Sequence, residues 1–297
     1  MQGNSARENR EAPRAPNGPI LLTSMNRLQF IELHEQAWFP PFLRNDITDT
    51  LQYGLNASKA YASIAPLLQG ALDSTGNPSI VDLCSGGGGP WFDLVRRLQW
   101  DTRDFHISFT DRYPNHGAFA NAAICSRIPI RFCEGPVDAR NVPAELGGFR
   151  TMFTSFHQFP FNEARTILQN AVDARQGIGI FEITRRTPLA ILLIVLWSLT
   201  PFLFTFFVRP FRWSRLLLTY VIPIIPFVLL FDGVVSCLRT YPPVELREMT
   251  KNLDATDYRW EAGELRGAFL GVPVTYLMGY PPPPSAGAAR FPHPDSQ

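Results

Sequence analysis

The chain has little lysine and almost no net charge. Lys59 and Lys251 are its two lysines among 27 basic residues; neither follows a glycine-rich loop, and neither stands four residues after a tyrosine. This excludes a phosphate-binding P-loop and the Tyr-x-x-x-Lys pair of short-chain oxidoreductases. A net charge of +1 provides no broad cationic field, so nucleic acid is not expected as a substrate or partner.

Cysteine is also scarce. The four cysteines form no Cys-x-x-Cys pair, so the sequence predicts neither a zinc site nor a disulfide framework, and it fits a reducing compartment. No apolar leader precedes the fold, so we expect no signal peptide. Residues 1–18 offer almost nothing apolar to bury and are expected to be disordered, and the proline-rich residues 281–297 are expected to form a flexible tail.

The remaining length is enough for one α/β core with additions. Helical periodicity between residues 25 and 72, broken at Pro40 and Pro41, predicts a helical cap of two or three helices over residues 19–75. Glu32, His34, Glu35 and Trp38 fall in this cap and are candidates to line the substrate side of a pocket beneath it, although a solvated or hydrogen-bonded surface position is the more common environment for a lone histidine between two carboxylates. Predicted strands follow at residues 79–82, 104–110, 128–133, 149–156, 177–183, 258–265 and 272–280.

A glycine cluster at residues 79–91 is the feature around which these elements are arranged. An apolar run ends at Asp82, four glycines follow, and an amphipathic segment begins at Trp91. This order predicts a strand, a tight loop and a helix, where glycines let the backbone approach a ligand closely. Trp91 stands where a dinucleotide fingerprint needs its third glycine, which argues against NAD or FAD.

The loop resembles motif I of the class I S-adenosylmethionine-dependent methyltransferases. Asp82, Cys84, Gly86 and Gly88 occupy the four positions of the pattern Asp/Glu-x-Gly-x-Gly-x-Gly, with cysteine in place of the first glycine. The resemblance implies a Rossmann-like fold, a seven-stranded and mostly parallel sheet, over residues 76–186 and 240–280. It also implies S-adenosylmethionine as the cofactor and small molecules as substrates, because the Asp/Asn-Pro-Pro-Tyr/Phe motif of nucleic-acid and peptide-amide methyltransferases is absent.

Acidic residues at the ends of later strands agree with a nucleoside ligand. Asp111 stands at the end of the second strand, roughly 20 residues beyond the glycine loop, where an acid can accept hydrogen bonds from both ribose hydroxyls. A plain turn residue before Pro114 is the alternative. Asp138 follows the third strand, where the resemblance implies a contact with the adenine and a plain turn is equally plausible. The implied cofactor site comprises Asp82, Cys84, Ser85, Gly86, Gly87, Gly88, Asp111, Arg112, Asp138, Ala139 and Ser155.

His157 is the candidate catalytic residue. It follows the fourth strand, and the carboxyl ends of strands in an open parallel sheet face the ligand crevice. Its ring suits a general base acting on an acidic acceptor, and a structural histidine is the alternative. Glu182, near the end of the fifth strand, faces the acceptor pocket in one of its two possible registers.

An apolar insertion at residues 187–239 interrupts the methyltransferase pattern. Residues 187–208 and 216–231 lack charge, and Arg209, Arg212 and Arg215 lie between them. We expect two helices that dip into one leaflet, with arginines and aromatic residues near the head groups and the catalytic domain on the cytoplasmic side; a soluble lid is the alternative. Asp232 is either a helix-end residue or an acceptor-site carboxylate.

The resemblance implies methyl transfer from S-adenosylmethionine, and the apolar insertion adds the expectation of a small, lipophilic acceptor at or near a membrane. The alternative is a membrane-associated binding or scaffold protein that kept the fold and lost the chemistry. Cofactor binding without turnover would distinguish the second from the first.

Overall fold

A seven-stranded sheet forms the centre of the protein in a computed structural model that describes residues 25–76, 79–99, 105–125, 129–251, 253–254, 257–267 and 271–282. The expectations for residues 1–18 and for most of the tail lie outside these ranges. The strand order is β3-β2-β1-β4-β5-β7-β6, and β7 alone runs antiparallel to its neighbours β5 and β6. The strands are β1 (Ser79–Asp82), β2 (His106–Phe109), β3 (Ile130–Phe132), β4 (Phe149–Phe153), β5 (Ile178–Glu182), β6 (Arg259–Leu265) and β7 (Val274–Tyr280).

Helices cover both faces of this sheet because successive strand residues point to opposite sides. Ile80 packs with α2 and α3, whereas Val81 packs with α5 and α10. The helices of the sheet domain are α1 (Pro41–Ala57), α2 (Ala65–Thr75), α3 (Trp91–Leu94), α4 (His116–Cys125), α5 (Phe161–Asp173) and α10 (Pro243–Thr250).

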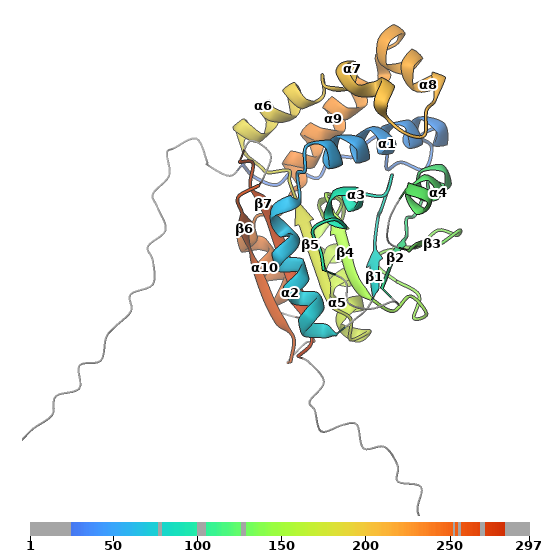
Figure 1. Cartoon of the computed structure of the whole chain (residues 1–297). Coiled ribbons are helices and arrows are strands. Elements are labelled where there is room, and N and C mark those ends of the chain that lie inside the picture. The colour runs from blue at the N-terminus through green and yellow to red at the C-terminus, as the bar shows by residue number, and fades with distance from the viewer. Residues whose placement is uncertain are drawn as a thin grey trace, which may run out of the picture.

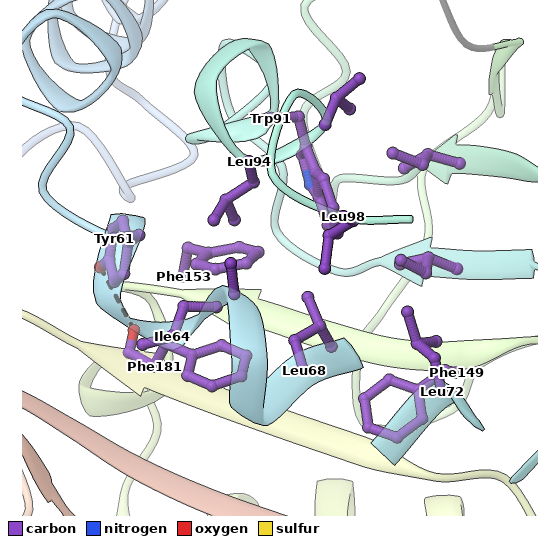
Figure 2. Packing of buried hydrophobic residues seen from close by; sticks show 14 of the residues in the cluster. Tyr61, Ile64, Leu68, Leu72, Trp91, Leu94, Leu98, Phe149, Phe153 and Phe181 are labelled. Carbon is purple, nitrogen blue, oxygen red and sulfur yellow. Dashed lines mark hydrogen bonds between the residues drawn. The ribbon is translucent and has the colours of Figure 1, made fainter. Parts of the chain in front are cut away.

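Figure 2 shows the first face of this core. Leu68 of α2 and Leu94 of α3 lie over the aromatic rings of β4 and β5, and the rings of Phe153 and Phe181 stack with centroids 5.2 Å apart. The Tyr61 hydroxyl donates a hydrogen bond to the carbonyl of Phe181. Burial of these large side chains fixes the strand ends that carry the site residues described below.

The insertion forms a separate helical layer at one end of the molecule (Figure 1). It contains α6 (Pro188–Trp197), α7 (Pro201–Phe204), a 3-10 turn at Thr205–Phe207, α8 (Trp213–Leu216), a π-helical turn at Leu217–Val221 and α9 (Ile224–Arg239). Helix α1 lies beneath it, and a third, smaller core joins Leu43 and Ile47 of α1 to Ile225 and Leu229 of α9. Helix α1 also contacts the glycine loop at Thr48, so it lies between that loop and the insertion.

The predicted helix before Pro40 is wrong. Residues 25–40 form an irregular strap with two turn-type backbone bonds, Gln36 N to Leu33 O and Phe39 N to Gln36 O, while other backbone groups of the strap bond to other elements. The amide of Met25 donates to Arg186 O, that of Leu28 to Leu238 O, and that of Leu33 to the carboxylate of Asp232. These tertiary partners compete with the local bonds that a helix needs, and helical periodicity alone does not reveal them.

Candidate active site

A cavity of about 780 Å³ lies between the carboxyl ends of the strands, the strap, α1 and the insertion. Its walls include the glycine loop, the segments after β2, β3, β4 and β5, and the inner faces of α6 and α9. The volume is at the upper end of the range for ligand pockets, which gives room for a cofactor and an acceptor together. Ten of the eleven residues that the resemblance implied for the cofactor line it; these are Asp82, Cys84, Ser85, Gly86, Gly87, Asp111, Arg112, Asp138, Ala139 and Ser155.

The glycine loop bends sharply over the end of β1. Gly86 has a φ of 55° and Gly88 a φ of 103°, and Cys84 adopts a φ of 55° at the position where the family pattern has glycine. A Cβ on Gly87 would lie 2.5 Å from the carbonyl oxygen of Thr48, so the loop and α1 approach more closely than any side chain allows. Gly88 packs on the ring of Phe109 instead of lining the cavity.

Two carboxylates organise this loop. Asp82 is fully buried and accepts a hydrogen bond of 2.7 Å from the Thr151 hydroxyl, and burial raises its pKa to about 7. Asp111 accepts hydrogen bonds of 2.8 Å from the backbone amides of Gly86 and Tyr113. It therefore joins the end of β2 to the loop while its carboxylate remains part of the cavity wall.

The far side of the cofactor end is formed after β3 and β4. Arg140 Nη2 donates to Asp138 Oδ2 at 2.6 Å. A nucleoside base that binds the Asp138 carboxylate would therefore share it with the Arg140 guanidinium. The Ser155 hydroxyl lines the cavity and is buried with no hydrogen-bond partner among the described residues. An unpartnered hydroxyl in a cavity wall fits a site that a polar ligand completes.

Comparison with solved structures identifies this architecture. The plantazolicin methyltransferase BpumL, solved in complex with SAH, superposes with a TM-score of 0.52 over 84% of this chain and 95% of its own, at 11% sequence identity. The chain has the class I methyltransferase fold. The resemblance seen in the glycine loop is thus confirmed at the level of the fold, together with the seven-stranded sheet and its helical insertion.

Two further structures with this methyltransferase fold are more distant. The O-methyltransferase NcsB1 from neocarzinostatin biosynthesis has 14% identity over 81% of this chain, with a TM-score of 0.46, and human N-acetylserotonin methyltransferase has 14% identity over 84%, with a TM-score of 0.47. The chain spans 58% and 59% of their lengths. No protein-family model and no curated protein matches the sequence.

The structure gives His157 a different environment from the one that a general base needs. The side chain is buried and does not line the cavity, and its ring nitrogens lie 2.8 Å from Glu182 and 3.1 Å from Glu32. Burial opposes the charge on the ring, but the two carboxylates outweigh it and raise the pKa of His157 to about 10. An imidazolium whose two N–H groups are both hydrogen-bonded has no lone pair to accept a proton. We therefore do not assign the general-base role to His157.

Of the two orientations open to Glu182, the structure shows the one that points away from the acceptor pocket. It points at His157, accepts a second hydrogen bond from the His157 backbone amide at 3.1 Å, and is buried. The pair fixes the turn after β4, whose neighbours Ser155 and Gln158 do line the cavity. His157 is therefore a positioning residue in this structure.

The polar end of the cavity comes from the strap and α9, which sequence reasoning treated as less informative. His34, Glu35 and Asp232 line the cavity, and Asp232 lies inside α9 instead of at a helix end. Its carboxylate accepts from the backbone amides of Leu33 and His34 and bonds His34 Nδ1 at 2.7 Å. Of the positions expected for His34, the structure gives the one in a pocket wall, because the strap brings the half-buried ring against Asp232 and not into solvent.

Arg239 balances the acids of this cluster. Its guanidinium lies 3.4 Å from Glu32 and 3.2 Å from Glu35, and Ser236 of the same helix donates to Glu32 at 2.9 Å. A charged or hydroxyl-bearing residue every three to four positions, at Asp232, Ser236 and Arg239, marks one face of an otherwise apolar helix. That spacing was the available signal for the polar end of the cavity.

Proposed function

We propose that the protein is an S-adenosylmethionine-dependent methyltransferase that acts on a small, lipophilic acceptor at a membrane surface. The observation that carries this proposal is the convergence of ten expected cofactor residues on one cavity whose opposite wall is apolar. When bound, the cofactor supplies an electrophilic methyl group on a sulfonium. The chain supplies a close backbone approach at Gly86 and Gly87, hydrogen-bond acceptors at Asp111, and a deep cavity that positions the two reactants and limits the access of water.

The insertion supports a lipophilic acceptor. Leu193, Ile194 and Trp197 of α6 and Leu229 of α9 line the cavity opposite the glycine loop. Leu196 lines the cavity and is also 56% exposed, so the cavity reaches the surface on the outer side of α6. A molecule dissolved in a bilayer would meet an apolar route at this opening.

The outer surface of the insertion supports a membrane location. Most of the large apolar side chains that are exposed within the described ranges lie between Leu189 and Phe231, and we call this surface the apolar face. Exposed apolar areas of this extent mark interaction or membrane sites. Leu203 and Trp213 are 77% exposed, Val221 70% and Phe207 64%.

The helix geometry favours an in-plane arrangement over a span. Pro188–Phe207 is long and apolar enough to cross a membrane, with 20 residues, a mean hydropathy of 2.3 and 22% burial. The second apolar stretch is bent by 78°. Its helix α9 carries Asp232, which bonds His34, and Arg239, which pairs with Glu35, at the polar end of the cavity. Because α9 is held by the sheet domain, we propose that the insertion enters one leaflet while the catalytic domain stays on the cytoplasmic side.

Two of the three arginines between the apolar stretches, Arg212 and Arg215, serve a purpose other than the expected one, whereas Arg209 is exposed. Arg215 is buried and pairs with Asp49 and, at 3.4 Å, with Asp46; Arg212 lies 3.3 Å from Asp46. These two guanidiniums fasten the insertion to α1 instead of facing lipid head groups. Their pairing leaves the apolar and aromatic side chains as the main membrane contact.

Calorimetric titration with S-adenosylmethionine and S-adenosylhomocysteine tests the cofactor site. We expect the wild type to bind both, and Asp111→Asn to bind more weakly by about 1.5–3 kcal/mol, roughly 10- to 150-fold, because a hydrogen bond to a charged acceptor is lost. Asp73→Asn, on the exposed side of α2, is the matched control and should bind as the wild type does. A folded wild type that binds neither compound would contradict the proposal.

A further inference from the structure

The polar end of the cavity contains one carboxylate oxygen that the protein leaves unused. Glu35 Oε2 pairs with Arg239 at 3.2 Å, whereas Oε1 is buried and has no hydrogen-bond partner among the described residues. Glu35 lines the cavity. A buried carboxylate oxygen without a donor is costly to maintain, which indicates that a ligand completes it.

His34, the preceding lining residue, offers the complementary group. Its Nδ1 is bonded to Asp232, so Nε2 is the ring nitrogen left to meet a ligand. Burial disfavours the charged ring, but the hydrogen bond and the charge of Asp232 outweigh burial and raise the pKa of His34 to about 9. At neutral pH the ring is therefore a cationic donor in the wall of the same cavity as Glu35.

Both residues lie within electrostatic reach of the cofactor end. Burial chiefly raises the pKa of the Cys84 thiol, and the charge of Glu35 adds to this effect. Burial likewise raises the pKa of Asp111, and His34 opposes it. The polar end and the glycine loop also line one cavity, so the polar end is not a separate site.

We infer that Glu35 and His34 together bind a neutral hydroxyl group at one end of an apolar acceptor, with Glu35 taking its proton. This inference rests on the proposed function. A hydroxyl can accept a hydrogen bond from His34 Nε2 and donate one to Glu35 Oε1 at the same time. An ammonium has no lone pair for His34, and a carboxylate has no proton for Glu35, so each leaves one protein group unsatisfied.

The transfer balances with these groups alone. The hydroxyl proton moves to Glu35 Oε1, and the acceptor oxygen uses an electron pair to form a bond to the methyl carbon. The carbon–sulfur bond breaks, and its pair stays on the sulfur, which becomes a thioether. The proton then leaves Glu35 for solvent, so the carboxylate is regenerated.

The ionisation of Glu35 suits this role. Burial and the charge of Glu32 raise its pKa to about 7, and Arg239, His34 and His157 oppose that rise. The surrounding cluster contains four carboxylates and three cationic side chains. Its net charge is therefore zero when Glu35 is protonated and the other six groups are charged. The cluster consists of Glu32, Glu35, Glu182, Asp232, His34, His157 and Arg239.

Binding of a matched set of naphthalenes tests the inference without turnover. The full chain in detergent, with and without S-adenosylhomocysteine, is titrated with 2-naphthol, 2-naphthoate, 2-naphthylmethylammonium and 2-methylnaphthalene. We expect 2-naphthol to bind at least tenfold more tightly than the other three. Its affinity should rise about tenfold between pH 6 and pH 8, because the ionised fraction of a carboxyl with a pKa near 7 rises about tenfold over that interval.

Glu35→Gln should remove the pH dependence, and Glu35→Asp should retain it. Glu248→Gln, in an exposed pair with Lys251, is the control and should behave as the wild type does. Unchanged binding of S-adenosylhomocysteine shows that each variant is folded. Equal affinities within the set, no binding of any member, or a pH profile that Glu35→Gln leaves unchanged would overturn the inference. If the folded wild type does not bind S-adenosylhomocysteine, the proposed function itself is overturned.

Discussion

At the scale of single residues, the buried charges behind the cavity hold the turn after β4 in place. His157 is the centre of this arrangement, since it lies between Glu182 and Glu32 and all three are buried. Removing one member of such a group leaves an uncompensated charge in a medium that solvates it poorly. The residue that sequence reasoning assigned to catalysis therefore has a measurable structural role.

Replacing His157 by glutamine should lower the free energy of unfolding by about 3 kcal/mol at pH 6, because two buried carboxylates lose their cation. The pKa of His157 is raised to about 10 in the folded state. The histidine therefore stabilises fully below its unfolded pKa, near 6.5, and this contribution disappears as the pH rises toward 10. Urea unfolding of wild type and variant from pH 6 to pH 10 measures the difference, which should shrink with rising pH.

His116→Gln, at the exposed start of α4, is the control and should be within about 0.5 kcal/mol of wild type at every pH. A difference between wild type and His157→Gln that grows with pH would show that the ring is neutral in the folded protein.

The position of the glycine-loop residues at the cavity could be predicted from the sequence, whereas the strap residues and Asp232 were predicted there only as alternatives to surface and helix-end positions. Asp82, Gly86 and Asp111 follow strands closely, so their place at the sheet edge is set by local order. Glu35 and Asp232 are 197 positions apart, and only the inward fold of the strap brings them to one cavity. No short-range pattern encodes such a contact.

At the scale of elements, α1 connects the two parts of the protein. Its Thr48 carbonyl lies against the glycine loop at Gly87, and its Asp49 pairs with Arg215 of the insertion. Asn115, before α4, donates to Asp49 at 2.9 Å and to Thr48 at 3.1 Å, which joins both contacts. A shift of α1 would therefore move the insertion and the cofactor loop together.

Gly87→Ala should push the glycine loop and α1 apart, because the added Cβ has no room between them. The new Cβ would meet the Thr48 carbonyl at 2.5 Å, and a backbone atom cannot turn aside as a side chain can. We expect a loss of about 1–3 kcal/mol in the free energy of unfolding and at least tenfold weaker binding of S-adenosylhomocysteine, measured by urea unfolding and calorimetry.

Gly70→Ala in α2 is the matched control, since its Cβ would meet nothing within 4 Å. It should stabilise the protein by about 0.5–1 kcal/mol through helix propensity. Equal effects of the two substitutions would refute the close contact between loop and helix.

At the scale of the whole molecule, the apolar face and the opening of the cavity lie on the same layer. The sequence predicted the insertion and its apolar character, but its arginines were expected at head groups, and two of them, Arg212 and Arg215, are instead paired with α1. Charge counted along the chain cannot show which guanidiniums already have buried partners. The proposed membrane location therefore rests on the exposed side chains of the apolar face.

Replacing Leu203, Phe207, Trp213 and Val221 together by serine should release the protein from lipid vesicles. Burying each side chain contributes about 1.5–3 kcal/mol, so the loss should exceed a hundredfold in partition coefficient, measured by flotation with liposomes of mixed neutral and anionic lipids. The four side chains are mostly exposed, so the fold should persist.

Ile124 and Val244 are comparably exposed outside the insertion, at 84% and 71%, and their change to serine provides the control. If the quadruple variant floats as well as the wild type, the apolar face is not the membrane contact.

The position of β7 has a consequence for the order in which the chain is made. This strand comes last in sequence among the strands, yet it fills the place between β5 and β6. During synthesis the insertion leaves the ribosome before β7 exists, while the edge of β5 is still unpaired. An open strand edge and an uncovered apolar segment then coexist in one nascent chain, which is a state prone to aggregation. Early contact of the insertion with a bilayer would shield the newborn chain while its sheet is completed.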